Sequence, residues 1–339
     1  MDGVQLARTC AVAGIAAGRR IRDTLYAMPL AERGTRCTSR LKPVKNVRAD
    51  AVAEEVGLAA LADLSHAVGH PLELIVDVTK GESLRIGASN GPPAIWVSFD
   101  AVDGTVKVAG LGNELPGRLR AANDGAWAAT MAFTAPTTKA LHELTVGDFV
   151  VAAVVDGNPT VQETYPQDVI CVPGMNGLES YDVTRDRERR VFTSTNCRLA
   201  QSMVFLDGFQ AYDRETRAVG DEELAVELYR RLINRHEGGA YDVLRQFGSL
   251  SALQRVMLGW REGLPWYESQ GTAFIVINEN LPNLIPSVPI VEGAGGLCVD
   301  FDGQPLRERT LAAGRTSIVY AANESVRDHV LQIIRQARA

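Results

Sequence analysis

Apolar residues follow two patterns along the chain, and together these patterns predict a mixed α/β fold. Some segments repeat apolar positions every three to four residues, as amphipathic helices do, while others are short apolar runs bounded by Gly, Pro and Asp, as buried strands are. Helices are predicted over residues 2–28, 48–69, 221–234, 250–260 and 324–337. Strands are predicted over residues 72–78, 94–99, 149–155, 202–205 and 318–321, with a further apolar run at 127–133. Because helices and strands alternate without an internal repeat, we expect layered sheets and helices.

Two kinds of segment break these patterns. Residues 29–46 are rich in Arg, Lys and Pro and predict a loop, while residues 160–200 are polar and turn-rich and predict no element. Polar stretches at 160–195 and 260–280 are candidates for a lid or an oligomer contact. Trp260, Trp266 and Tyr267 lie in the second stretch and could line a substrate pocket, although core or interface packing is the commoner role of such residues.

Composition narrows the classes of protein that fit. The chain has 339 residues, 46% of them hydrophobic and 22% charged, as in an ordinary globular protein, and its net charge of -6 argues against a nucleic-acid-coating protein. No apolar run reaches the roughly 18 residues that a membrane-spanning helix needs, and no leader segment is predicted. The five cysteines show no metal-ligand or paired spacing, so we expect reduced thiols and a cytoplasmic location.

Candidate chemistry is concentrated in residues 99–105, which read Phe-Asp-Ala-Val-Asp-Gly-Thr. A strand delivers Asp100, the chain turns at Asp103, and Thr105 is placed to open a helix. Two carboxylates at a strand end suit a hard cation such as Mg²⁺, and a helix start beside them offers N–H groups to a phosphate. An Asp-Gly turn with a capping threonine explains the same residues, and the motif alone leaves both interpretations open.

The segment resembles the Asp-Pro-Ile-Asp-Gly-Thr signature of the inositol monophosphatase-like sugar phosphatases, a superfamily that includes fructose-1,6-bisphosphatase-like enzymes. Other stretches resemble the same family in the same order, over roughly residues 45–335. These are the Gly-Glu-Ser at 81–83, the Arg-Gln-Phe-Gly-Ser at 245–249, the run at 290–306 with its Ala-Gly-Gly and Asp-Gly-Gln-Pro-Leu, and the strand-like 317–323.

The resemblance implies a fold, a cofactor and a set of roles. The fold is a layered αβαβα sandwich, with an N-terminal α+β half over 1–200 that carries the metal-site acids and a C-terminal α/β half over 201–339 that completes the cleft. Two or three Mg²⁺ ions would activate a water, and a homodimer is expected. The implied metal ligands are Glu82, Asp100, the carbonyl of Val102, Asp103 and Asn283; the implied catalytic residues are Thr105, Glu82 and Asp103; and the implied phosphate-binding residues are Gly104, Thr105, Lys107, Gly248 and Ser249.

The chain departs from the family pattern at several places, one of them Ala101, which stands where the signature has proline. The family's Trp-Asp pair falls on Pro282 and Asn283, so that a neutral amide stands where an aspartate is usual. The family's upstream Thr-x-x-Asp falls on Ala53 and Val56, where Glu54 or Glu55 could substitute only with a small shift of the match. Lys107 follows the signature, where it could bind phosphate, replace the charge of a missing metal ion, or be an ordinary solvated lysine.

Two functions are compatible with the family resemblance and its departures. The first is a Mg²⁺-dependent phosphatase that hydrolyses a small sugar, cyclitol or nucleotide phosphomonoester by metal-activated water. The second is a divergent member with an altered metal site, which binds a phosphorylated ligand or catalyses a different reaction. Neither involves nucleic acid or a membrane as partner, and the sequence does not identify the substrate.

Overall fold

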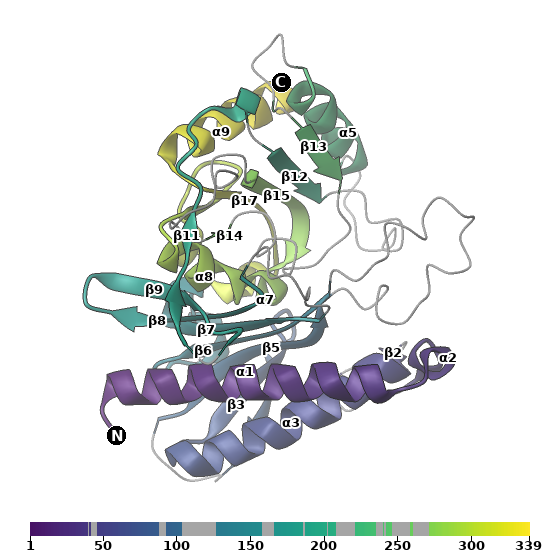
Figure 1. The fold of residues 1–339 in the computed structure, drawn as a ribbon, viewed down its shortest axis with the longest axis vertical. Coiled ribbons are helices and arrows are strands. Elements are labelled where there is room, and N and C mark those ends of the chain that lie inside the picture. Colours follow the sequence, from purple (N-terminus) through teal and green to yellow (C-terminus); the bar gives the residue numbers. More distant parts are fainter. Residues whose placement is uncertain are drawn as a thin grey trace.

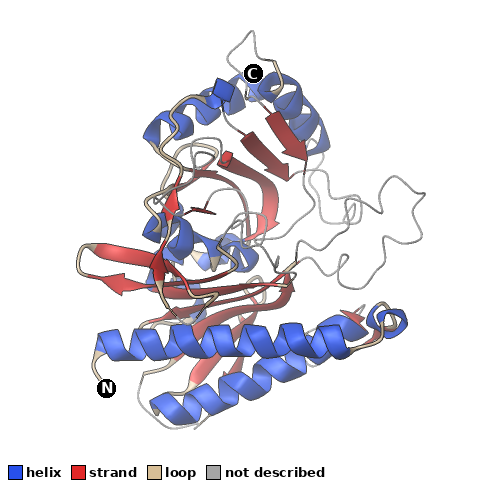
Figure 2. Cartoon of the chain, in the orientation of Figure 1, coloured by secondary structure: helices blue, strands red, loops and turns tan. Residues whose placement is uncertain are grey.

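A computed structural model describes most of the chain (Figure 1). The described residues are 1–39, 41, 46–87, 93–103, 127–157, 166–185, 187–201, 203–207, 221–234, 240, 242–245, 258–259 and 271–339. Within them, helices and strands stack in five alternating layers, which Figure 2 shows by colour. The predicted αβαβα sandwich is therefore confirmed.

Two long helices form the first layer, α1 (Gly3–Ala27) and α3 (Arg48–Val68). The side chain of Asp2 caps α1 by accepting a hydrogen bond from the Gln5 amide, and Gly69 ends α3 in the left-handed conformation with φ 71°. The small side chains of α1 let it lie close to the sheet beneath it. A Cβ atom on Gly18 would meet Val155 at 2.6 Å, so this close contact requires glycine.

The larger sheet forms the second layer and has the order β10-β9-β8-β7-β6-β5-β3-β4 in the described part of the chain. Its strands are β3 (Leu72–Asp77), β4 (Glu82–Ile86), β5 (Ile95–Asp103), β6 (Ala128–Thr134), β7 (Phe149–Asp156), β8 (Asp168–Gly174), β9 (Gly177–Asp182) and β10 (Arg189–Arg190). Neighbours are antiparallel except β3 and β5, which run parallel. This one parallel pair brings the carboxyl ends of two strands to the same edge.

The smaller sheet forms the fourth layer, with the order β13-β12-β15-β17-β16. Its strands are β12 (Met203–Asp207), β13 (Asp242–Arg245), β15 (Gly271–Asn280), β16 (Leu297–Asp300) and β17 (Arg315–Ala321). Its outer face packs on the fifth layer, α5 (Asp221–Leu232) and α9 (Glu324–Arg338). Asn323 caps α9 by accepting a hydrogen bond from the Val326 amide.

The third layer lies between the two sheets and contains α7 (Leu281–Leu284) and α8 (Ser287–Gly293). The apolar core here joins side chains from both sheets, among them Val154 of β7 and Tyr320 of β17. The Tyr320 ring lies 5.9 Å from that of Phe274, centroid to centroid. This shared core fixes one sheet against the other, and with them the loops at their edges.

Short elements complete the described chain. They are α2 (Leu30–Arg33), β1 (Arg36–Cys37), β2 (Asn46–Val47), β11 (Phe192–Thr193), β14 (Leu258–Gly259), and the 3₁₀ turns η3 (Leu141–Glu143), η4 (Val146–Asp148), η5 (Leu199–Gln201), η8 (Leu306–Glu308) and η9 (Leu311–Ala313). No helix among the described residues is both long and apolar enough to cross a membrane.

Most of the predicted elements are confirmed, but three segments predicted as loops or polar stretches contain helices or strands, and one predicted helix contains a strand. Residues 160–200 contain the β8–β9 hairpin, whose inner strand is buried in the sheet, so this stretch is not simply a lid or an oligomer contact. Likewise β15, within the stretch 260–280, is a central strand. The loop predicted at 29–46 includes α2, β1 and the start of β2. Of the helix predicted at 250–260, only 258–259 are described, and these form a strand.

Candidate functional site

Acidic residues end the strands that meet on one edge of the sandwich. Asp77 ends β3, Asp103 ends β5, and Glu279 precedes the last residue of β15. The parallel pairing of β3 with β5 runs from Leu72 opposite Ile95 to Leu74 opposite Val97, and both strands continue from there to their acidic ends. The carboxyl ends of adjacent parallel strands share an edge, so the two aspartates come from neighbouring positions.

A register irregularity accompanies the acids on all three strands. The pairing shifts between Ile75 and Asp77 in β3, between Asp100 and Asp103 in β5, and between Val276 and Glu279 in β15. In β15 the irregular stretch includes Asn278, whose φ of 51° is rare for a residue with a side chain. Bulges of this kind re-aim side chains, and they are frequent beside active sites.

The end of β5 alternates buried apolar and half-buried acidic positions. Ala101 and Val102 are buried, while Asp100 and Asp103 are half-buried. One carboxylate oxygen of Asp100 accepts a hydrogen bond from the Val102 amide at 3.2 Å, which holds the turn between the two aspartates. The strand thus keeps both carboxylates partly accessible at its end.

Helix α7 lies against β5 and brings Asn283 to the same region. The Ser98 hydroxyl of β5 donates a hydrogen bond to the Pro282 carbonyl at 2.8 Å. The Asn283 amide in turn donates to a carboxylate oxygen of Glu279 at 3.1 Å. Asn283 therefore stands beside an acid, and the position without the usual aspartate has a carboxylate within hydrogen-bond distance.

The Tyr320 hydroxyl is fully buried in the core between the two sheets. Burial raises the pKa of the Tyr320 hydroxyl well above its ordinary value; Cys298 adds to the rise, and the negative charges of Asp103 and Glu279 add smaller amounts, while the Ser287 hydrogen bond opposes it. Both carboxylates therefore act on one buried hydroxyl, which itself lies 2.5 Å from the Ser287 hydroxyl.

Asp77 is fixed in the turn that follows β3. Its Oδ1 accepts hydrogen bonds from the Thr79 amide at 2.9 Å and the Thr79 hydroxyl at 2.6 Å, and Lys80 Nζ lies 3.1 Å from Oδ2. The Thr79 hydroxyl is the largest cause that lowers the pKa of Asp77 to about 2, with Lys80 contributing. The Asp77 carboxylate is therefore ionised at neutral pH.

Glu82, the predicted bridging ligand, opens β4 on the edge of the sheet and is exposed. It pairs across the hairpin with Asp77. Asp77 ends β3, which is hydrogen-bonded to β5, whereas Glu82 begins β4, which is the outermost described strand on this side of the sheet.

Sequence reasoning missed Asp77 and Glu279 as site residues. Asp77 lies within the predicted strand 72–78, and a polar residue at the end of such a strand was the available signal. Glu279 stands four positions before Asn283, but their contact depends on where β15 ends and α7 begins. The spacing of residues along the sequence therefore does not predict the position of Asp77 beside β5 or the contact between Glu279 and Asn283.

The upstream departure from the family pattern has a packing reason. Val56 of α3 packs against the apolar cluster of α1, α3 and the end of β5. Its neighbour Glu54 is buried, with a carboxylate oxygen 3.4 Å from the Leu41 amide, while Glu55 is exposed. The apolar side chain at position 56 thus contributes to the core behind Asp100.

Five of the predicted site residues lie outside the described part of the chain. They are Gly104, Thr105, Lys107, Gly248 and Ser249. The described candidates at this edge are Glu82, Asp100, Val102, Asp103 and Asn283, joined by Asp77, the cross-strand partner of Glu82, and by Glu279.

The oxygen atoms at this edge are of the kinds that bind a hard cation, but the described acidic side chains do not come together around one point. Carboxylate, amide and backbone carbonyl oxygens are the ligands that Mg²⁺ prefers. Within the described ranges, however, no three acidic, histidine or cysteine side chains converge as a group that could hold a metal ion. The edge therefore supplies suitable oxygen ligands on adjacent elements, two of them already engaged with Thr79, Lys80 or Asn283.

Comparison with known proteins identifies the fold. No protein-family model and no curated protein matches the sequence. Solved structures do match. The extragenic suppressor protein suhB from Bartonella henselae has a TM-score of 0.61 at 14% identity, covering 96% of this chain and 97% of that chain.

Two further structures agree over nearly the full length. The inositol monophosphatase from Anabaena (Nostoc) sp. PCC 7120 has a TM-score of 0.58 at 18% identity, covering 97% of this chain and 96% of that one. The fructose-1,6-bisphosphatase from Leishmania major has a TM-score of 0.62 at 11% identity, covering 96% and 92%. The chain thus has the inositol monophosphatase/fructose-1,6-bisphosphatase-like fold that its motifs resemble, in a divergent sequence.

Proposed function

We propose that this protein is a Mg²⁺-dependent phosphatase of a small phosphomonoester, such as a sugar, cyclitol or nucleotide phosphate. The observation that carries the proposal is the packing of α7 on β5 through the Ser98–Pro282 hydrogen bond, because α7 carries Asn283, the partner of Glu279, and β5 ends in the acidic segment that resembles the family signature. The fold shared with sugar phosphatases supports it. A homodimer and a cytoplasmic location belong to the same proposal.

Each candidate residue has a proposed task in this site. Asp100, Asp103 and the Val102 carbonyl would hold the metal, with Glu82 or Asp77 from the neighbouring hairpin and Asn283 from α7. When bound, Mg²⁺ would neutralise phosphate charge and lower the pKa of a water molecule. Glu279 would orient the Asn283 amide, to which it is already hydrogen-bonded. Thr105 would position the attacking water, while Gly104, Lys107, Gly248 and Ser249 would contact the phosphate.

Phosphate release tests the proposal directly. The purified protein should release phosphate from at least one member of a panel of sugar, cyclitol and nucleotide phosphates, with Mg²⁺ and not with a chelator. Asp103→Asn should lower the rate by at least about a hundredfold, because a metal ligand loses its charge. Asp23→Asn, on the exposed face of α1, is the matched control and should leave the rate unchanged. Release that persists in Asp103→Asn would contradict the assignment.

The second candidate, a divergent member that binds without hydrolysing, is favoured by the neutral amide of Asn283. For this function, a phosphorylated compound should stabilise the protein while no compound of the panel is turned over. Two well-occupied metal ions at Asp100, Asp103 and Glu82 in Mn²⁺-soaked crystals would count against it.

A further inference from the structure

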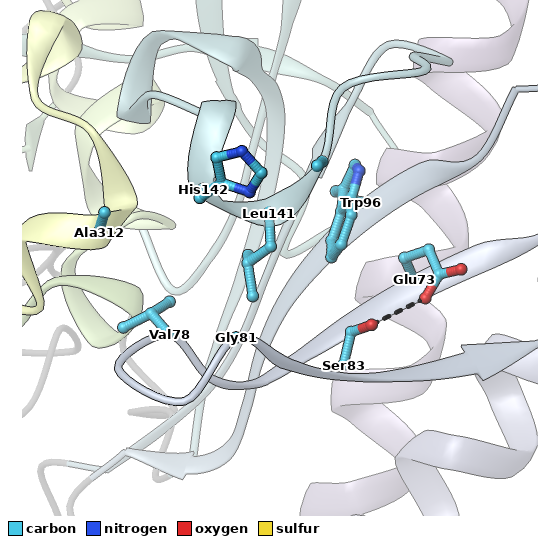
Figure 3. A pocket seen from close by; sticks show the side chains of 9 residues that line it. Glu73, Val78, Gly81, Ser83, Trp96, Leu141, His142 and Ala312 are labelled. Carbon is cyan, nitrogen blue, oxygen red and sulfur yellow. Dashed lines mark hydrogen bonds between the residues drawn. The ribbon is translucent and has the colours of Figure 1, made fainter.

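A cavity of about 300 Å³ lies beside the candidate site, on the inner face of the β3–β4–β5 edge (Figure 3). The strands contribute Glu73, Ser83 and Trp96, and η3 contributes Leu141 and His142. Its volume is at the low end of the range for small-molecule sites, about 300–1,000 Å³. Any ligand must therefore be small.

The cavity has an apolar wall and a polar rim. Val78, Leu141 and the indole of Trp96 form the wall, and the Trp96 ring N–H already donates to the Lys139 carbonyl at 3.1 Å. The ring therefore contributes apolar surface to the cavity. The rim carries Glu73, Ser83 and His142, which Figure 3 shows around the same opening.

The charges of the rim are already balanced. Glu73 Oε1 lies 2.6 Å from Arg85 Nη1, and the Ser83 hydroxyl donates to Glu73 Oε2 at 3.1 Å. An anion would face the Glu73 carboxylate, and a cation would compete with Arg85 for it. Uncharged hydroxyl groups are neither repelled by Glu73 nor in competition with Arg85, since they can donate to the carboxylate and accept from other donors.

His142 adds a polar group that is free to rotate toward a ligand. It is exposed, and its ring makes no hydrogen bond to any residue that the structure describes. An imidazole, a hydroxyl and a carboxylate around an aromatic wall match a molecule with hydroxyls on its edge and C–H groups on its face. We propose that the cavity binds a small neutral polyol of monosaccharide size.

The cavity also borders the elements that hold the candidate site. Val78 and Gly81 belong to the turn that contains Thr79, a partner of Asp77. Ala312 of η9 lies two residues before Gly314, whose carbonyl accepts a hydrogen bond from Leu281 at the start of α7. A bound polyol would therefore contact both the β3–β4 turn and the segment that supports α7.

Calorimetric titration with glucose, ribose and glycerol tests the proposal without using turnover, so its outcome is independent of the phosphatase assignment. At least one polyol should bind, and Ala312→Phe should weaken binding at least tenfold by filling the cavity. Ala313→Phe, at the neighbouring exposed position that does not line the cavity, should bind like the wild type. His142→Ala and Ser83→Ala, both at exposed positions, should weaken binding several-fold and cover the case in which Ala312→Phe fails to fold.

Hydrogen exchange gives a second readout, since a bound polyol should slow exchange of the amides of residues 78–81. Three results would overturn the proposal: no polyol binding at millimolar concentration, equal loss in Ala312→Phe and Ala313→Phe, or tighter binding of glucose 6-phosphate or ethanolamine that Ala312→Phe abolishes.

Discussion

At the residue scale, the contact between Asn283 and Glu279 distinguishes this site from one with an aspartate at position 283. The amide donates to the carboxylate, so the pair is stable without a cation between them. An aspartate at position 283 would instead place two carboxylates within about 3 Å, where like charges repel unless a cation separates them.

Asn283→Asp should accordingly make stability depend on Mg²⁺. Without the metal, we expect the melting temperature to fall below that of the wild type, because the new carboxylate faces Glu279. With Mg²⁺, binding to the folded state should recover the loss. Thermal unfolding of both proteins, with and without Mg²⁺, measures the effect. A variant that gains no more from Mg²⁺ than the wild type would argue against a cation between these positions.

Glu292 of α8 is expected to make stability depend on pH. Burial raises its pKa to about 7 from 4.5, although Arg307 at 3.2 Å opposes the rise. The folded state therefore binds the proton more tightly than the unfolded state, and the free energy of unfolding should fall as pH rises from about 4.5 to 7.

Glu292→Gln should remove this fall, which we expect to be on the order of 2 kcal/mol. Urea denaturation at pH 5 and pH 8 compares the variant with the wild type, and Glu55→Gln on the exposed side of α3 is the control. An unchanged pH dependence in Glu292→Gln would show that another group causes it.

At the element scale, α1 depends on glycine for its distance from the sheet. A Cβ on Gly18 would lie 2.6 Å from a methyl group of Val155, and one on Gly14 would lie 2.7 Å from the Cβ of Ala153. Such contacts are shorter than packed side chains allow, so that helix and strand would have to separate.

Gly18→Ala should lower the free energy of unfolding by about 1–3 kcal/mol, even though alanine favours helix by up to about 1 kcal/mol. Gly3→Ala is the matched control, because its Cβ would meet nothing within 4 Å. Urea denaturation should therefore show that Gly18→Ala lowers the free energy of unfolding clearly more than Gly3→Ala does. Equal effects would mean that α1 is not held by this contact.

The elements predicted from the sequence are those with a regular apolar period. The helices α1, α3, α5 and α9 and the strands β3, β5, β7, β12 and β17 follow it. The β8–β9 hairpin does not, because β9 carries polar residues such as Glu179 and Ser180 among its apolar ones. The acids of β5 and Asn283 were predicted from motifs, whereas Asp77 and Glu279 depend on strand register and the β15–α7 junction, which no local pattern specifies. The division of the chain near residue 200 stays a prediction.

At the scale of the whole molecule, one apolar core joins the two sheets. It contains Phe149 and Val154 from the larger sheet and Phe274 and Tyr320 from the smaller one. Because these side chains pack on one another, separating the sheets would expose apolar surface on both.

The two sheets should therefore unfold together. Native-state hydrogen exchange should give similar free energies of opening for Ala152 in β7 and Val319 in β17, which are both hydrogen-bonded central positions. A markedly lower value for the β17 amide would show that the smaller sheet opens independently.

The position of α1 also bears on how the chain assembles during its synthesis. This helix is translated before its partners β7 and β8, which follow after a delay of roughly ten seconds at typical elongation rates. Until then the face with Leu6, Cys10 and Ile15 has no sheet to cover it. The growing chain therefore carries this apolar face without its covering strands until β7 and β8 have been made.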